Sequence, residues 1–183
     1  MPCYDGLPAR LVVVSGLPGA SKTTLAKALA QELRAVYLRV DVVETPLTRA
    51  GIDVGPLGYE VVRELAASNL GLGGQVVVDL VNPLPITRQM WTDLAGKQEV
   101  GLVVFECHVP DVDEHRRRIE TREPDLSGQV LPTWAEVVSR EYTPWDERRD
   151  GSRILLDMTD SDEGIKQALA ALAGKDGADD SVD

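Results

Sequence analysis

The chain has 183 residues, of which 43% are hydrophobic, and a formal net charge of -11; this length suffices for one core of ordinary size and is too short for two large domains. Because contacts to a nucleic-acid backbone need clustered Lys and Arg, the acidic charge argues against long nucleic acid as the usual ligand. Two cysteines, Cys3 and Cys107, argue against a disulfide framework, and the absence of a signal sequence or a membrane-spanning apolar run predicts a cytoplasmic protein.

The first predicted elements are a strand over Arg10 to Ser15, a glycine-containing loop and a helix over Thr23 to Arg34. The loop matches the phosphate-binding template Gly-x-x-x-x-Gly-Lys-[Ser/Thr] at Gly16, Lys22 and Thr23. In such a loop, backbone N–H groups and the helix dipole bind phosphate, the lysine reaches the β- and γ-phosphates, and the hydroxyl ligates Mg²⁺. The alternative is a tight turn without a ligand. We expect ATP to contact Gly16, Leu17, Pro18, Gly19, Ala20, Ser21, Lys22, Thr23 and Thr24.

The loop departs from the template at Ser21, where the second glycine should stand. If this position needs a left-handed backbone, a residue other than glycine costs roughly 1 to 2 kcal/mol. We therefore expect strain at Ser21 and weaker nucleotide binding, without loss of the site.

Two aspartates stand at the carboxyl ends of predicted strands. Asp41 comes after the strand Val36 to Val40, and Asp79 closes the strand Gln75 to Asp79, whose uninterrupted valines are typical of burial on both faces. Because ligands bind outside the carboxyl ends of parallel strands, both aspartates are expected on the edge that carries the glycine-containing loop. Between these strands we expect two helices, over Val42 to Ala50 with a break or reset at Pro46, and over Tyr59 to Asn69.

The remaining elements continue the alternation of strands and helices. An irregular stretch over Pro124 to Pro132 is expected to be a mobile lid. The pattern predicts a three-layer α/β/α sandwich with a mainly parallel five-stranded sheet, in one domain over residues 1–173 with a small helical lid at about 116–133 and a disordered acidic tail over 174–183. The predicted elements are a helix capped by Thr87, a strand over Leu102 to Cys107, a charged helix over Asp111 to Arg122, a helix over Trp134 to Tyr142, a strand over Arg153 to Asp157 and a helix over Asp162 to Ala173.

The two aspartates have different expected roles. Asp79 suits a Walker-B-like role, in which it holds Mg²⁺ together with Thr23, and Asp41 could accept the proton of an attacking hydroxyl. The alternatives are a helix or turn cap for Asp79 and an N-cap for Asp41.

Several arginines are candidates for binding anions. Arg118 and Arg122 lie one helical turn apart, so both can clamp phosphoryl oxygens; the alternative is a solvated helix whose arginines pair with glutamates, which we favour for Arg116 and Arg117. Arg88 is a candidate for binding a substrate anion or polar group; the alternative is an exposed surface arginine. His108 and His115 lack a second ligand pair at metal-binding spacing.

Taken together, these motifs resemble the small P-loop kinases grouped with chloramphenicol phosphotransferase, zeta toxins and the kinase domain of polynucleotide kinase. The resemblance spans residues 10–157 and includes Arg39-Val40-Asp41 and the Asp79 strand followed by Asn82-Pro83. It implies a P-loop NTPase fold of the nucleoside-kinase type, with Asp41 as catalytic base and Arg118 and Arg122 on the phosphates. Arg39 and Asn82 are then further candidates for substrate contacts.

The expected function is ATP- and Mg²⁺-dependent transfer of the γ-phosphate to a hydroxyl of a small metabolite or antibiotic, which would include a role as a resistance enzyme. The expected partners are a nucleotide and a small hydroxyl acceptor. The alternatives are a kinase of 5′-hydroxyl nucleotides or polynucleotides, and a nucleotide-binding regulatory ATPase that needs no acceptor pocket. The sequence leaves the acceptor, the choice of ATP or GTP and the oligomeric state open.

Overall fold

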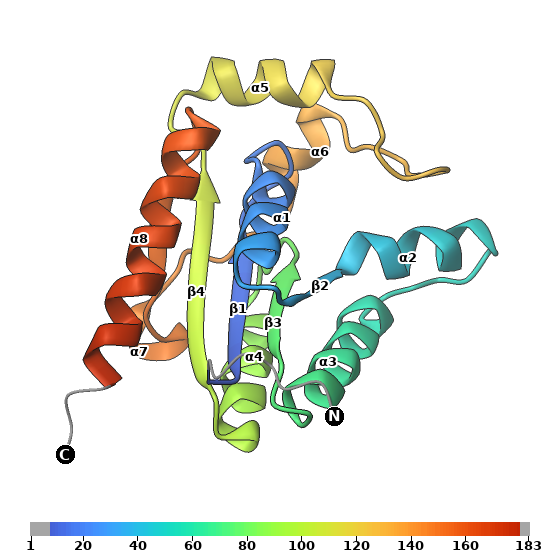
Figure 1. The fold of residues 1–183 in the computed structure, drawn as a ribbon. Coiled ribbons are helices and arrows are strands. Elements are labelled where there is room, and N and C mark those ends of the chain that lie inside the picture. The colour runs from blue at the N-terminus through green and yellow to red at the C-terminus, as the bar shows by residue number, and fades with distance from the viewer. Residues whose placement is uncertain (1–7, 180–183) are drawn as a thin grey trace.

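The computed structural model describes residues 8–179, which form a five-stranded sheet with helices on both faces (Figure 1). The strand order is β2-β3-β1-β4-β5, and every neighbouring pair is parallel. This confirms the predicted three-layer α/β/α sandwich. The strands are β1 (Arg10–Ser15), β2 (Val36–Arg39), β3 (Gln75–Asp79), β4 (Gly101–His108) and β5 (Ile154–Asp157).

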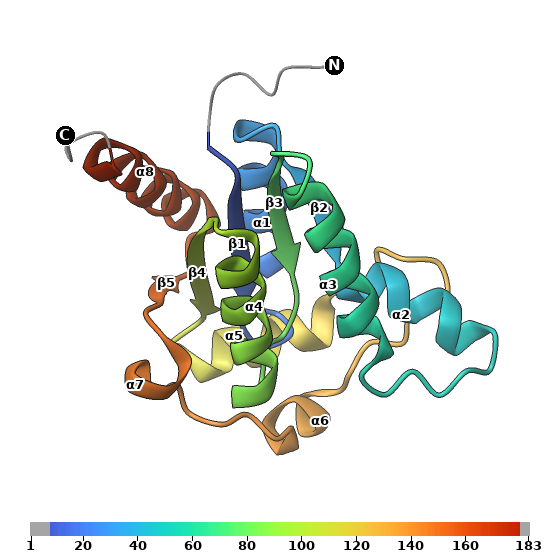
Figure 2. The same ribbon diagram turned by 90° about the horizontal axis from the view of Figure 1, so that it is seen from below.

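The helices divide between the two faces of the sheet and its carboxyl edge. Figure 2 shows α1 and α8 on one face and α3 and α4 on the other. Their bounds are α1 (Lys22–Glu32), α2 (Val40–Arg49), α3 (Leu57–Leu70), α4 (Pro85–Gln98), α5 (Val112–Thr121), α6 (Trp134–Ser139), α7 (Glu147–Asp150) and α8 (Ser161–Asp179). Within the described residues, none of these helices has the length and apolar composition needed to cross a lipid bilayer.

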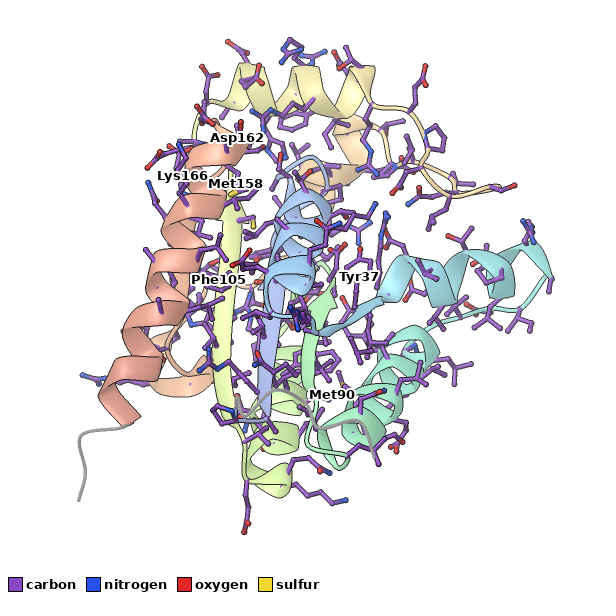
Figure 3. The ribbon with its side chains drawn as sticks, viewed as in Figure 1. Tyr37, Met90, Phe105, Met158, Asp162 and Lys166 are labelled. Atoms are coloured by element: carbon purple, nitrogen blue, oxygen red, sulfur yellow. The ribbon has the colours of Figure 1, made fainter. Side chains whose placement is uncertain are left out.

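The central strand β1 divides its side chains between two hydrophobic clusters. Val12 and Val14 pack toward α1 and α8, whereas Leu11 and Val13 pack toward α3 and α4. All four are fully buried, and burying one such side chain contributes about 1.5–3 kcal/mol. Phe105 and Met158, labelled in Figure 3, complete the first cluster. The two-sided core holds the carboxyl ends of β1 and β3 in fixed register, with Val14 opposite Asp79.

Two elements build the carboxyl edge of the sheet. Figure 1 shows α5 lying across the strand ends and the segment after it reaching toward α2. Contacts support this arrangement, because the Arg49 guanidinium of α2 donates to the Ser127 carbonyl oxygen at 3.2 Å. The irregular stretch therefore lies beside α2 at the carboxyl edge of the sheet, and its role as a mobile lid stays a prediction.

Several predicted boundaries need correction. The strand β2 ends at Arg39, so Asp41 is the second residue of α2 rather than a strand end. Pro46 does not break α2. Its missing N–H costs the helix one hydrogen bond, but the helix continues and the Pro46 carbonyl oxygen still accepts from Ala50 N at 3.0 Å. The helix predicted over 134–142 ends at Ser139, and α7 was not predicted.

The C-terminal prediction also changes. The last helix continues to Asp179, so the tail predicted from Gly174 is helical over its first six residues. Residues 180–183 and the N-terminal residues 1–7, which include Cys3, lie outside the described part of the chain.

Candidate active site

The loop between β1 and α1 has the backbone of a phosphate-binding turn. Gly16 has φ 135° and Gly19 has φ 82°, conformations that L side chains rarely adopt. A Cβ at Gly16 would also collide with the Cys107 carbonyl oxygen of β4. The glycine in this loop is therefore needed for its close approach to β4 as well as for its backbone angles.

Ser21 has the left-handed backbone that the template reserves for glycine, with φ 56° and ψ 21°. The expected strain is therefore present at the residue directly before α1. The Ser21 hydroxyl also accepts a hydrogen bond from Arg118 Nη1 at 3.2 Å. This contact gives Ser21 a role that a glycine could not have.

Replacing Ser21 with glycine should relieve the strain, so we expect the free energy of unfolding to rise by about 1 kcal/mol and ATP affinity to be preserved or tightened. Urea unfolding and titration calorimetry measure the two effects. Ser21→Ala is the matched control, since it removes the hydroxyl and keeps the strained Cβ. A large loss of ATP affinity in both variants would contradict the strain argument and assign the effect to the contact with Arg118.

Lys22 and Thr23 are the first two residues of α1 and directly follow the loop. Lys22 Nζ donates to the Leu17 carbonyl oxygen at 3.2 Å, which folds the ammonium group over the loop. Burial lowers the pKa of Lys22, whereas the Asp79 and Asp41 carboxylates act in the opposite direction. A phosphate group at the loop would compensate the buried ammonium charge in the same way.

Thr23 and Asp79 meet at the carboxyl end of β3. Thr23 Oγ1 donates to Asp79 Oδ2 at 2.7 Å, and the Tyr37 hydroxyl of β2 donates to the same oxygen at 2.9 Å. Asp79 is 2% exposed, and the N-cap of the next helix, α4, is Leu84. A hydroxyl and a carboxylate oxygen beside a phosphate loop fit Mg²⁺, which keeps several waters and takes few protein ligands.

Asp41 lies at the N-terminal turn of α2 and is held by two donors. Arg39 Nη2 donates to Asp41 Oδ2 at 2.8 Å, and Gln129 Nε2 from the lid segment donates to the same oxygen at 3.2 Å. The N-cap of α2 is Arg39, so the N-cap alternative for Asp41 is wrong. The Asp41 side chain remains 41% exposed, and it lines the central cavity.

Arg39 links three carboxylates from distant parts of the chain. Its guanidinium binds Asp125 through Nη1–Oδ2 at 2.5 Å and Nη2–Oδ1 at 3.1 Å, and its Nε lies 3.7 Å from Asp79 Oδ2. The Arg39 side chain is 5% exposed. These contacts position Asp41 and the segment around Asp125. Arg39 also lines the cavity, so its contact with a substrate stays a prediction.

Arg118 and Arg122 both line the cavity, on the side of the phosphate loop. Arg118 is anchored by Glu114 Oε1 at 2.7 Å and by the carbonyl oxygens of Met158 at 2.9 Å and Thr159 at 2.8 Å. Arg122 directly follows α5 and lies near enough to Lys22 to lower its pKa. The alternative of a solvated helix face applies to Arg116 and Arg117, which pair with Glu120 and Glu114 respectively.

Arg88 and Asn82 do not line the cavity. The Arg88 side chain is fully buried, pairs with Asp150 Oδ2 at 2.8 Å and donates to the Thr143 carbonyl oxygen at 2.6 Å. The Arg88 guanidinium also lies 4.6 Å from the Trp145 ring centroid. Asn82 is 1% exposed and has a left-handed backbone with φ 58°. The structure thus corrects the expected substrate roles: Arg88 joins the segment around α7 to α4, and Asn82 shapes the exit from β3.

One open cavity of about 1350 Å³ brings the remaining candidates together. One half is formed by the phosphate loop, α1, Arg118 of α5 and Arg122. The other half extends from Asp41 along α2 to the start of α3 and α4, and includes Glu44, Tyr59, Met90 and Arg140. Figure 3 labels Met90 of α4, which lines this cavity, and Tyr37 of β2, whose hydroxyl donates to Asp79. The cavity is therefore large enough for two molecules, one on each side of Asp41.

Several residues of the site were not predicted from the sequence. Tyr37 could have been noticed as the hydroxyl-bearing residue of a strand that leads to Asp41, and Glu44 as the acid one helical turn after it. Asp125 and Gln129 carry no signal in the sequence, because their partners lie 86 and 88 residues away.

Comparisons with known proteins agree with this architecture. A family model described as AAA domain matches residues 11–139. A gluconokinase from Sinorhizobium meliloti 1021 is 20% identical with a TM-score of 0.67, and the match covers 96% of this chain and 98% of that chain. The Mycobacterium tuberculosis APS kinase CysC, solved with AMPPNP and APS, is 18% identical with a TM-score of 0.64, over 91% of this chain and 98% of that chain.

A third similar structure is Chaetomium thermophilum Kti12 in complex with ADP-AlF3, which is 20% identical with a TM-score of 0.67. That match covers 90% of this chain and 97% of that chain. No curated protein matches the chain. At these identities the likeness concerns the fold, and it confirms the resemblance to P-loop kinases at that level.

Proposed function

Because the chain belongs to the AAA domain family, whose model matches residues 11–139, we propose that it is an ATP-dependent kinase that phosphorylates a hydroxyl of a small metabolite or antibiotic. One observation carries this proposal: Lys22 of the phosphate loop and the Asp41 carboxylate line the same cavity, which continues beyond Asp41 along α2. A protein that only binds or hydrolyses a nucleotide has no need for this second half.

The proposed reaction is a direct in-line transfer. The acceptor oxygen bonds to the γ-phosphorus, the bond from that phosphorus to the bridging oxygen of ATP breaks, and ADP leaves. Asp41 accepts the proton of the attacking hydroxyl. Arg39 and Gln129 hold the Asp41 carboxylate in place, which supports a base of fixed orientation.

The phosphates have their own set of groups in this proposal. Backbone N–H groups of Gly19 and of Ser21 to Thr24, together with the Lys22 ammonium, bind the β- and γ-phosphates, and Arg118 and Arg122 stabilise the transferring group. Thr23 and Asp79 would hold Mg²⁺, which neutralises charge on the phosphates when bound. The 2.7 Å contact between these two side chains supports a shared role.

A screen of acceptors with labelled ATP tests the proposal. The panel contains neutral polyols, amino alcohols, hydroxy acids, phosphorylated sugars, hydroxyl-bearing antibiotics and an oligonucleotide with a 5′-hydroxyl end. We expect a phosphorylated small molecule in the presence of Mg²⁺. Phosphorylation of the oligonucleotide alone would favour a polynucleotide kinase, and free phosphate as the sole product across the panel would favour a regulatory ATPase.

A further inference from the structure

Glu44 is a titratable side chain of the cavity that the proposed mechanism does not use. It lies three residues after Asp41 on α2, a spacing that places both side chains on one face of a helix. Both residues line the cavity, and Glu44 lies in the half that extends along α2 beyond Asp41. A substrate whose hydroxyl reaches Asp41 from this side would therefore lie beside Glu44.

The position of the Glu44 carboxyl depends on a glycine of the neighbouring helix. A Cβ at Gly58 in α3 would collide with Cγ, Cδ and Oε1 of Glu44. Gly58 is buried and has an ordinary backbone conformation, so its lack of a side chain is not needed for a turn. The glycine leaves room for the Glu44 carboxyl between α2 and α3.

The half of the cavity around Glu44 contains carboxylates and arginines. Asp41 lies on the same helix face, Tyr59 contributes a neutral hydroxyl, and Glu60 lines the cavity from α3 with its carboxylate paired to Arg63 Nη2 at 2.9 Å. The cations of this half are Arg140, which follows α6, and Arg39, which already binds Asp41 and Asp125. An acceptor with a negative group next to its reacting hydroxyl would meet like charges here.

We infer that Glu44 determines acceptor specificity: its carboxylate accepts a hydrogen bond from an amine or hydroxyl group next to the hydroxyl that is phosphorylated, and it selects against acceptors that carry a carboxylate or phosphate at that place. This inference rests on the proposed kinase function and names its substrate class. Donor groups suit Glu44 because an ionised carboxylate only accepts hydrogen bonds.

The protonation of Glu44 gives the inference a pH dependence. Burial and the nearby Asp41 raise the pKa of Glu44 to about 7, and Arg140 acts in the opposite direction. The ionised form accepts the donor group, so the KM for the acceptor should fall as pH rises from 6 to 8. The change should be about 5- to 10-fold, as expected for one group that titrates between these values.

Kinetics with variants test the inference directly. With the best acceptor of the screen, Glu44→Gln should raise the acceptor KM at least about tenfold at pH 8 and remove its pH dependence, while the KM for ATP stays unchanged. Gly58→Ala should give a similar increase because it displaces the Glu44 carboxyl. Gly96→Ala in α4 is the matched control, since apart from its chain neighbours and the nearby backbone of its own helix a Cβ there meets no atom within 4 Å.

Thermal melting tests the half-buried Glu44 carboxyl without an acceptor. The pKa of Glu44 in the folded protein lies above its ordinary value of 4.5, so its ionisation favours the unfolded chain as pH rises from about 4.5 to 7. Glu44→Gln should therefore melt at a higher temperature than the wild type at pH 8 and at a similar temperature at pH 4.5. Equal melting temperatures at pH 8 would mean that the carboxyl is solvated, and would overturn the inference.

The acceptors separate the remaining outcomes. A matched set of glucose, glucosamine, gluconate and glucose 6-phosphate accompanies the best acceptor, and a preference for glucosamine over glucose would identify an amine as the donor group. An anionic best acceptor, or an unchanged KM in Glu44→Gln, would overturn the inference and leave the kinase function standing. Absence of any phosphorylated product would overturn the proposed function and the inference together.

Discussion

Replacing Lys22 with alanine should lower the affinity for ATP by about 100-fold or more, because a charge-assisted hydrogen bond to a phosphate is worth about 1.5–3 kcal/mol and Lys22 is expected to contact two phosphates. The variant should keep its fold, since within residues 8–179 the ammonium group makes one hydrogen bond, to the Leu17 carbonyl oxygen. Its burial lowers the pKa of Lys22, so removing the charge also removes a desolvation cost. Titration calorimetry with ATP and Mg²⁺ measures the effect.

The control for this experiment is Lys97→Ala. Lys97 lies on the exposed side of α4 and does not line the cavity, so its loss should leave ATP binding unchanged. A folded Lys22→Ala protein that binds ATP as tightly as the wild type would mean that the loop before α1 is a structural turn. The phosphate-binding interpretation would then be wrong.

Replacing Asp41 with asparagine should leave ATP binding nearly intact and lower acceptor phosphorylation by roughly 100-fold to 10,000-fold, the usual contribution of a positioned general base. The structure favours a specific loss of chemistry, because an asparagine oxygen can still accept the hydrogen bonds that Arg39 and Gln129 donate to Asp41. The local geometry is therefore kept while the proton acceptor is lost. Single-turnover transfer at saturating ATP separates this effect from binding.

Asp93→Asn is the matched control for the same change of charge. Asp93 is an exposed residue of α4 that pairs with Gln89 and does not line the cavity, so its rates should equal those of the wild type. Wild-type transfer rates in Asp41→Asn would remove Asp41 from the mechanism. They would also leave open which group accepts the proton of the hydroxyl.

The parts of this molecule that are local in sequence were predictable. The strands β1 and β3 have the predicted bounds, because uninterrupted β-branched residues bounded by polar ones are typical of buried parallel strands. The left-handed backbone of Ser21 followed from its place in the loop template. The pairing of Thr23 with Asp79 followed from the expectation that the phosphate loop after β1 and the carboxyl end of β3 lie at one edge of the sheet.

The prediction that Arg88 contacts the substrate was wrong because the partners of Arg88 are distant in the sequence. Its position after the exit loop of β3 suggested a substrate contact, but α7 and the segment before it return across α4 and supply Asp150 and the Thr143 carbonyl oxygen. A buried guanidinium is stable only with such partners. Nothing in the residues next to Arg88 encodes these partners, which lie 55 to 62 positions away.

The sequence by itself determined the parallel sheet, the phosphate loop and the edge on which Asp41 and Asp79 lie, because backbone geometry and hydrophobic periodicity act over short stretches of chain. Only the tertiary structure decided which charged side chains face the cavity and which support it. Arg39 is held by Asp125 of the lid segment, and the Glu44 carboxyl occupies the space left by Gly58. Such pairings depend on how distant elements pack, since the strength of a charge interaction is set by burial and separation in space.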